Sequence, residues 1–427
     1  MQTSFTPEQL QDPKIAASND VLRACVHCGF CTATCPTYVL LGDENDSPRG
    51  RIYLMKEMLE QGKPATAETV KHIDRCLSCL SCMTTCPSGV NYMHLVDHAR
   101  VHIENTYKRP LFERVLRNAL AFIMPRPKLF RASLVLTRVA KLFAPITTGR
   151  LRAALDLSPS KLPRPMAIGM PGTYPAIGPK KARVALLQGC VQSVLDPAIN
   201  VATIQLLNRF GIEVVVSHGE SCCGSLTHHL GKDHDAMRRA KATIDQWTDE
   251  NVDAVIITAS GCGTTIKDYG FSLRNDVAYA SKAQAISVKT FDITEYLATL
   301  NLGIGQMNMR VAYHSACSLQ HGQKIKTLPL MLLQQAGFTV SEPENAHLCC
   351  GSAGTYNILQ PEISQNLRDK KIQSLEVLAP EVIASGNIGC IKQLQSKSKI
   401  PVLHTVQLLN WAYGGERPKF KSVIALN

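Results

Sequence analysis

A cysteine pattern that occurs twice near the N-terminus constrains the fold of this chain more than any other feature. Each copy has the spacing C-x2-C-x2-C-x3-C-P, and each cysteine of the second copy lies 51 residues after its counterpart. The eight residues are Cys25, Cys28, Cys31, Cys35, Cys76, Cys79, Cys82 and Cys86. The constant offset indicates that one binding unit has been duplicated.

This spacing is typical of iron-sulfur binding. Three closely spaced thiolates bind three irons of one [4Fe-4S] cluster, and the cysteine before the proline binds the other cluster when two are present. We therefore predict one cluster on Cys25, Cys28, Cys31 and Cys86, and a second on Cys76, Cys79, Cys82 and Cys35. A zinc site made of two C-x2-C pairs is the alternative, but it leaves the third close cysteine and the proline without a role.

The sequence around these cysteines favours helices. Ser47-Pro48 is typical of a helix start, and Gly62 is typical of a helix end. Apolar residues recur at helical spacing in two runs, Ile52, Met55 and Leu59, and Tyr92, Val96, Ala99 and Ile103. We predict an α-helical ferredoxin module over residues 1–107. Its Arg49-Gly50-Arg51 sequence is placed to lie beside an anionic cluster or to contact a partner, and a surface charge pair is the alternative.

Residues 108–180 combine a basic segment with a linker. Between Lys108 and Arg152 there are eleven Lys and Arg residues and one acidic residue, Glu113, in a chain of net charge +12. Leucines and phenylalanines accompany these charges, as in amphipathic helices that lie on an anionic membrane surface. A helical hairpin with its cations in water is the alternative, and no nucleic-acid-binding motif accompanies the charge. Prolines and glycines between residues 159 and 179 predict a semi-extended linker.

The other eight cysteines form a second, independent duplication. They are Cys190, Cys222, Cys223 and Cys262, followed by Cys317, Cys349, Cys350 and Cys390. The offsets between counterparts are 127, 127, 127 and 128 residues. Four thiolates per repeat suffice for one further iron-sulfur cluster each, while zinc sites or metal-free redox thiols are alternatives. His314 and His321 flank Cys317. Two roles are considered for these histidines, a structural one and proton transfer.

Each cysteine-rich repeat alternates strands with helices. Strand-like runs precede the first cysteine, the Cys-Cys-Gly turn and the last cysteine, and long helical stretches lie between them. This order predicts two α/β units, over residues 181–305 and 306–427, with the cysteines at strand ends. The expected fold class is therefore α+β multidomain: an N-terminal α-helical two-cluster ferredoxin module followed by a duplicated α/β cysteine-rich domain of the CCG type.

Length and composition restrict the compartment. No apolar run approaches the roughly 18 residues that a membrane-spanning helix needs, and the N-terminal residues lack the apolar core of a secretory signal. Sixteen cysteines in 427 residues are then expected to be reduced and to serve metal or redox chemistry. We expect a protein of the cytoplasm.

Two stretches carry a family resemblance. The sequences from Leu22 to Cys31 and from His347 to Tyr356, together with both cysteine arrays, resemble the iron-sulfur subunits of bacterial glycolate oxidases over essentially the whole chain. The resemblance implies a peripheral complex on the cytoplasmic face of the inner membrane. In it, FAD-binding subunits oxidise glycolate to glyoxylate, and this subunit carries electrons towards the quinone pool. No catalytic residue is then expected in this chain, and nucleic acid is not an expected partner.

Related chains keep other functions open. The equivalent subunit of a lactate or glycerol-3-phosphate dehydrogenase is one alternative, and a heterodisulfide-reductase-like enzyme is another. In the resemblance to heterodisulfide reductases, each repeat closes with C-x2-C, but Ala259 and Asn387 stand at the first position of that pair here. Gly303-Ile304-Gly305 also lacks the third glycine of a dinucleotide fingerprint, so a flavin is expected in a partner.

Overall fold

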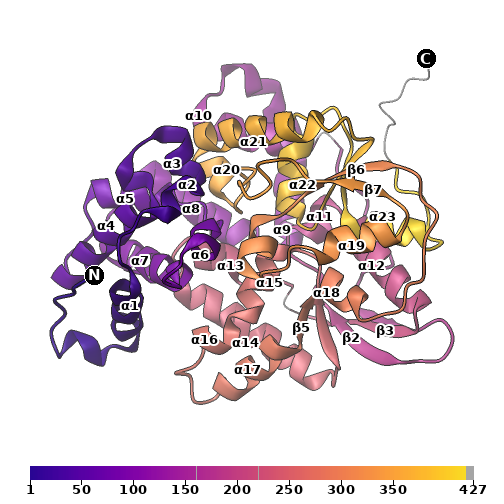
Figure 1. Cartoon of the computed structure of the whole chain (residues 1–427), viewed down its shortest axis with the longest axis horizontal. Coiled ribbons are helices and arrows are strands. Elements are labelled where there is room, and N and C mark those ends of the chain that lie inside the picture. Colours follow the sequence, from indigo (N-terminus) through magenta and orange to yellow (C-terminus); the bar gives the residue numbers. More distant parts are fainter. Residues whose placement is uncertain (160, 220, 420–427) are drawn as a thin grey trace.

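The computed structural model describes residues 1–159, 161–219 and 221–419. Residues 420–427 of the predicted second repeat therefore lie outside the described part of the chain. In Figure 1 the helical N-terminal part, in indigo and purple, lies beside the two α/β repeats, in pink to yellow. The arrangement confirms the predicted order of a helical module followed by duplicated α/β units.

The N-terminal module is built from helices around the cysteine loops. They are α1 (Pro13–Ala24), α2 (Phe30–Ala33), α3 (Pro36–Leu41), α4 (Pro48–Gln61), α5 (Ala67–Asp74), α6 (Ser81–Thr85) and α7 (Tyr92–Thr106). As predicted, Ser47 caps α4 by accepting the N–H of Gly50 at 3.0 Å, and Gly62 ends the helix in the left-handed region at φ 61°. Leu22, Met55 and Leu95 meet in the module's apolar core.

The middle segment is helical and spans both repeats. It consists of α8 (Leu111–Ile123), α9 (Pro127–Ala140), a short 3-10 helix (Lys141–Ile146) and α10 (Gly149–Leu157). Helix α9 packs on α11 (Gln192–Leu195) of the first repeat, while α10 packs on α20 (Tyr356–Leu359) and α21 (Pro361–Glu376) of the second. One face of α9, with Phe130 and Leu134, contacts Val194.

Each repeat contains a sheet, and four strands of the first sheet have the same topology as the four strands of the second. The first has the order β1-β3-β2-β4-β5 and the second β7-β6-β8-β9. The strands are β1 (Gly172–Tyr174), β2 (Ala182–Leu186), β3 (Ile212–Val216), β4 (Ala254–Ile257), β5 (Thr290–Asp292), β6 (Arg310–His314), β7 (Thr339–Ser341), β8 (Val382–Ser385) and β9 (Val402–His404). All pairings are parallel except β1 with β3. Within the predicted semi-extended linker, Gly172–Tyr174 forms the edge strand β1, whose backbone pairs with β3.

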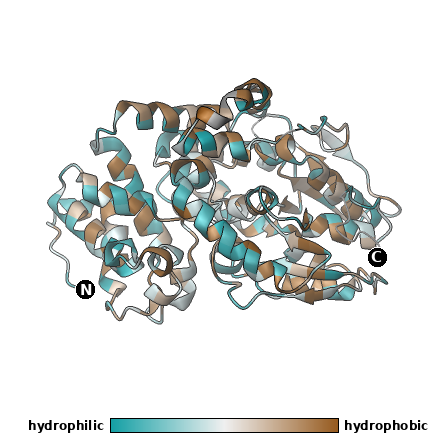
Figure 2. Ribbon diagram, turned by 90° about the horizontal axis from the view of Figure 1, so that it is seen from above, coloured by the Kyte–Doolittle hydropathy of each residue, from teal (hydrophilic) through white to brown (hydrophobic). Residues whose placement is uncertain are grey.

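Helices cover both sheets. The first repeat adds α12 (Ala198–Arg209), α13 (Ser225–His229), α14 (Asp233–Asp249), α15 (Ser260–Lys267), α16 (Tyr269–Ser272), α17 (Ala280–Lys289) and α18 (Ile293–Ala298). The second adds a π-helical turn (Ser318–Gly322), α19 (Leu328–Gln335), α22 (Ile388–Gln395) and α23 (Thr405–Ala412). Brown apolar and teal polar residues alternate along these helices in Figure 2, as expected for helices with one buried face.

The two repeats share a hydrophobic core. Helix α12 packs against α23, and α18 packs against α19, so each repeat covers the other in the same way. These contacts are equivalent because α12 and α19 follow the first cysteine of their repeats, and α18 and α23 follow the last strand. Residues from both sheets, such as Leu186 and Tyr313, belong to one buried cluster. The repeats are therefore two halves of one body related by a pseudo-two-fold axis.

Candidate metal centres

The first candidate centre lies in the N-terminal module. Cys25, Cys28, Cys31, Cys82 and Cys86 line one small cavity of about 30 Å³. The loop that carries the first three turns sharply through His27 (φ 55°) and Gly29 (φ 85°), which lets the thiols converge. Cys28 is exposed, whereas Cys25 is buried. This candidate centre is therefore close to the molecular surface.

The second candidate centre is buried. Desolvation raises the pKa of the Cys82 thiol well above its ordinary value, and the neighbouring charges of Cys79, Cys76 and Cys35 raise it further. Cys35 also acts on the pKa of Cys79. Cys35, from the first pattern, thus lies among the cysteines of the second pattern. Cys35 also raises the pKa of Cys31 in the first pattern, after the larger effect of burial, so the crossed pairing of the cysteines stays a prediction.

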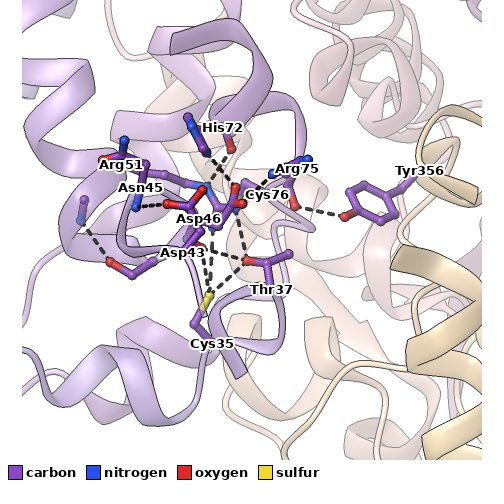
Figure 3. Close-up of polar contacts among 12 residues, drawn as sticks. Cys35, Thr37, Asp43, Asn45, Asp46, Arg51, His72, Arg75, Cys76 and Tyr356 are labelled. Atoms are coloured by element: carbon purple, nitrogen blue, oxygen red, sulfur yellow. Dashed lines mark hydrogen bonds and ion pairs between the residues drawn. The ribbon is translucent and has the colours of Figure 1, made fainter. Parts of the chain in front are cut away.

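A polar network surrounds the second candidate centre (Figure 3). Its centre is Asp46, a fully buried carboxylate that contacts His72 at 2.9 Å, Arg75 at 2.7 Å and Arg51 at 3.3 Å. The Arg51 guanidinium also donates to the Sγ of Cys35 at 3.8 Å. Burial disfavours the charge on Arg51, but the nearby Cys76, Tyr92, Cys35 and Asp46 outweigh that effect and raise its pKa.

A second donor reaches the same candidate centre from α7. The hydroxyl of Tyr92 donates to the Sγ of Cys76 at 3.7 Å. Two guanidinium groups, from Arg51 and Arg75, face the one carboxylate of Asp46. The surroundings of these four thiols therefore carry an excess positive charge, which suits an anionic cluster.

The cysteines of the two repeats converge on one cavity. All eight line a single space of about 230 Å³, which lies where the repeats meet the N-terminal module. They follow the carboxyl ends of parallel strands: Cys190 comes after β2, Cys222 and Cys223 after β3, Cys262 after β4, Cys317 after β6, Cys349 and Cys350 after β7, and Cys390 after β8. Carboxyl ends of parallel strands meet at one edge of a sheet, which explains the convergence.

Within each repeat the thiols lie in a chain of contacts. In the first repeat, Cys222 interacts with Cys190 and Cys223 through their side chains. In the second, the Sγ atoms of Cys317 and Cys349 are 3.3 Å apart, and Asn387 donates from Nδ2 to the Sγ of Cys390 at 3.3 Å. The side chain at position 387 therefore approaches a cysteine as a hydrogen-bond donor.

The second candidate centre adjoins the cavity of the repeats. Cys76 and Cys79 line that cavity, and Cys317 raises the pKa of the Cys79 thiol, after the larger effect of burial. The loop that follows the second Cys-Cys-Gly turn fixes this contact, because the Tyr356 hydroxyl donates to the backbone oxygen of Arg75 at 3.0 Å (Figure 3). The thiols of the module and of the second repeat are thus neighbours.

The basic segment is partly internal. Arg109 and Arg117 are buried, and Arg109 binds Asp74 at 2.6 Å. Arg117 lines the shared cavity and lies 3.8 Å from Asp74. The alternative of a hairpin with its cations in water is therefore wrong for these two residues, because acidic groups of the module draw them inward.

The donor set of both regions fits iron-sulfur clusters. Thiolates are soft ligands that select iron-sulfur clusters, zinc or copper(I), and four per cluster complete a [4Fe-4S] centre. In the described part of the chain, sixteen free cysteines gather in these places, and all of them except Cys35 line one of the two cavities. Such clusters, when bound, supply one-electron transfer.

Family models match both cysteine-rich regions. The "4Fe-4S dicluster domain" matches residues 21–90, and the "Cysteine-rich domain" matches residues 184–267 and 311–395. The glycolate oxidase iron-sulfur subunit of Escherichia coli (strain K12) is 43% identical over 96% of this chain and 99% of its own length. The chain belongs to the glycolate oxidase iron-sulfur subunit family.

Other relatives place this family in context. A probable glycolate oxidase iron-sulfur subunit of Bacillus subtilis (strain 168) is 31% identical over 97% of this chain and 99% of its own length. Lactate utilization protein A of the same organism is 26% identical over 53% of this chain and 99% of its own length. A hypothetical protein from Helicobacter pylori shares the fold, with a TM-score of 0.56 at 9% identity over 96% of this chain and 74% of its own. Members of the iron-sulfur subunit family are components of oxidoreductase complexes.

Some residues of these sites escape sequence reasoning. Asp46, His72 and Tyr92 belong to no sequence motif. Each of them nevertheless contacts the second candidate centre or the polar network around Asp46. The sequence places His314 three residues before Cys317, but it does not predict the surroundings of this histidine. Burial lowers the pKa of His314 to about 3, and the positive charge of Lys371 contributes a smaller effect in the same direction. The imidazole is therefore neutral.

Proposed function

We propose that this chain is the electron-transfer subunit of a glycolate-oxidising complex. Partner subunits that bind FAD oxidise glycolate to glyoxylate, and the thiols of this chain hold clusters that carry the electrons towards the quinone pool. The observation that carries this proposal is the shared cavity, in which Cys76 and Cys79 of the module meet all eight cysteines of the repeats. The candidate centres thus form one continuous series from the surface to the interior.

The series has a direction. Cys25, Cys28, Cys31 and Cys86 hold the first cluster, and Cys35, Cys76, Cys79 and Cys82 hold the second. One further iron-sulfur cluster is held by the cysteines of each repeat, and the second repeat is next in line because Cys79 and Cys317 are neighbours. The chain divides accordingly into the ferredoxin module at 1–107, the basic segment and linker at 108–180, and the two cysteine-rich repeats at 181–305 and 306–427.

The flavin-binding partner docks at the face that carries Cys28. This cysteine is exposed, and the neighbouring Val26 and Phe30 are 67% and 62% exposed. Exposed apolar residues that surround an accessible redox site are typical of a protein contact. Electrons therefore enter through the first cluster and leave through the repeats.

The complex lies against the cytoplasmic face of the inner membrane through the middle segment. Among the described residues, no helix has both the length and the apolar character to span a membrane. Ten apolar residues from α8 to α10 are nevertheless 49% to 81% exposed: Leu111, Phe112, Val115, Phe122, Val135, Leu136, Val139, Leu142, Ile146 and Leu151. The exposed cations Lys108, Arg114, Lys128 and Arg138 accompany them. Apolar and basic side chains together suit an anionic lipid surface.

Anaerobic metal analysis of the purified chain tests this proposal. Four [4Fe-4S] clusters require about sixteen irons and as many sulfides per chain. The chain should also copurify with flavoproteins that reduce it when glycolate is added, and it should oxidise no glycolate alone. Zinc in place of iron, or reduction by lactate in place of glycolate, would contradict the proposed cofactor or the proposed substrate respectively.

A further inference from the structure

His314 is a buried histidine without a hydrogen-bond partner. It ends β6 and is 1% exposed. Neither of its ring nitrogens has a hydrogen-bond partner among the described residues. A buried polar group normally has one, so two orphaned nitrogens on one ring need an explanation.

The ring lies among the thiols of the second repeat. A ring nitrogen of His314 and the Sγ atoms of Cys350 and Cys390 all lie within 4.8 Å of one another. These three side chains come from the ends of β6, the Cys-Cys-Gly turn and α22. Three donors at such distances can contact a common ion or cluster, and a neutral imidazole is a good ligand for iron or zinc.

Other buried histidines of the second repeat are satisfied. His404 bonds the backbone oxygen of Thr258 through Nε2 at 2.7 Å and accepts the N–H of Val406 at Nδ1. His321 contacts Thr84 and the backbone oxygen of His347. These two histidines of the second repeat therefore use both nitrogens, whereas neither nitrogen of His314 is bonded to a described residue.

The first repeat has no histidine at the position equivalent to His314. By the offset of 127 residues that relates Cys190 to Cys317, His314 corresponds to Leu187. Leu187 is buried in an apolar cluster with Cys223. The two repeats thus offer different donor sets, four thiols in the first and four thiols with an imidazole in the second.

We propose that His314 is a ligand of the metal centre in the second repeat, together with Cys350 and Cys390. This inference rests on the proposed iron-sulfur content of the repeats. A neutral imidazole adds no negative charge to the centre, and histidine ligation is associated with higher reduction potentials than thiolate ligation alone. The second repeat then accepts electrons from the N-terminal module more readily than an all-thiolate centre would.

Pulsed EPR of the reduced full-length chain tests the proposal. Protein labelled with ¹⁵N-histidine should show a strong nitrogen coupling on one cluster signal, shifted from that of the unlabelled protein. His314→Cys should keep the iron content, remove the coupling and lower the potential of that one centre. Iron that is lost in His314→Ala and retained in His314→Cys also supports a ligand role.

His404→Gln is the matched control, because it removes a buried histidine of the same repeat that has both nitrogens bonded. It should leave the strong coupling unchanged. The proposal is overturned if fully reduced wild-type protein lacks strong histidine coupling, or if His314→Ala retains it. A different result would separate the two proposals. If the chain has the expected iron content and histidine coupling but takes no electrons from a flavoprotein, the proposed function is refuted while the ligand role of His314 stands.

Discussion

Arg51 lies with Nη1 3.8 Å from the Sγ of Cys35, in a place where it is 1% exposed. A positive donor next to a ligand sulfur stabilises the reduced form of a cluster. We expect Arg51→Gln to lower the reduction potential of the cluster on Cys35, Cys76, Cys79 and Cys82. A hydrogen bond to a charged group contributes about 1.5 to 3 kcal/mol, which corresponds to roughly 60 to 130 mV for one electron.

EPR-monitored redox titration measures this shift. Arg49→Gln is the control, because Arg49 pairs with Glu44 at 2.6 Å near the first centre and is 37% exposed at its side chain. Tyr92→Phe removes the other donor, to Cys76, and should lower the same potential by a smaller amount. Equal shifts of both clusters in Arg51→Gln would show that the effect is not local.

The proposed crossed pairing of the N-terminal cysteines predicts which cluster each substitution disturbs. Cys35→Ser should alter the cluster whose other ligands are Cys76, Cys79 and Cys82, although Cys35 belongs to the first pattern. Cys86→Ser should alter the cluster in the small cavity with Cys25, Cys28 and Cys31. In EPR spectra and redox titrations, Cys35→Ser should therefore change the signal and potential of the second cluster, and Cys86→Ser those of the first cluster. This is the reverse of what the order of the cysteines in the sequence would suggest. An uncrossed result would place Cys35 with the first three cysteines.

The exposed apolar face of α9 predicts membrane binding. Replacing Val135, Leu136 and Val139 by serine removes apolar area that is available for insertion. Each side chain contributes on the order of 1 kcal/mol when it is buried, so binding to vesicles with anionic lipid should weaken about tenfold or more. Cosedimentation measures this binding. A triple serine variant at exposed apolar residues outside the segment, Val277, Val288 and Ile304, should bind like wild type. Equal loss in both variants would contradict the proposed surface.

The contact between α7 and α13 predicts a pH dependence. Burial opposes the charged form of His228, but Asp97, at 3.2 Å, outweighs it together with Asp233 and Asp268, and the pKa of His228 is raised. A raised folded-state pKa means that this contribution to stability is complete below the ordinary histidine pKa of about 6.5. It is lost as the pH rises through the folded value.

Hydrogen exchange of α7 and α13 measures this effect. Exchange in the wild type should accelerate, beyond the intrinsic rate, as the pH rises from 6 to 9. In His228→Gln the protection of both helices should be lower at pH 6 and should vary less with pH. A wild type whose protection is constant over that range would show that His228 does not titrate in the contact.

Local sequence signals predicted much of the fold. Ser47 and Gly62 bound α4 as expected, because caps act within one turn of the chain. The central strands of both repeats were predicted by their apolar runs. The edge strand β1 and the outer strands β5 and β9 were not, since their pairing depends on partners elsewhere in the chain.

The sequence indicates candidate ligands, whose role stays a prediction, but it does not predict their surroundings. Spacing is sufficient to group thiols that one loop holds together. It does not distinguish buried Arg51 from the more exposed Arg49 two residues earlier, because that difference depends on Asp46, Arg75 and the packing of α4 against α5. The convergence of both repeats on one cavity is likewise a property of the tertiary fold.

The packing of α12 against α23 and of α18 against α19, across the boundary between the repeats, has a consequence for the history of such chains. A single repeat would leave the partner-covering faces of its two helices exposed, so an ancestral half would have needed a second, identical copy of itself. In such a homodimer both halves must carry the same side chain at every position. Fusion into one polypeptide removes that constraint, and Leu187 and His314 are two residues of equivalent position that only a fused chain is free to make different.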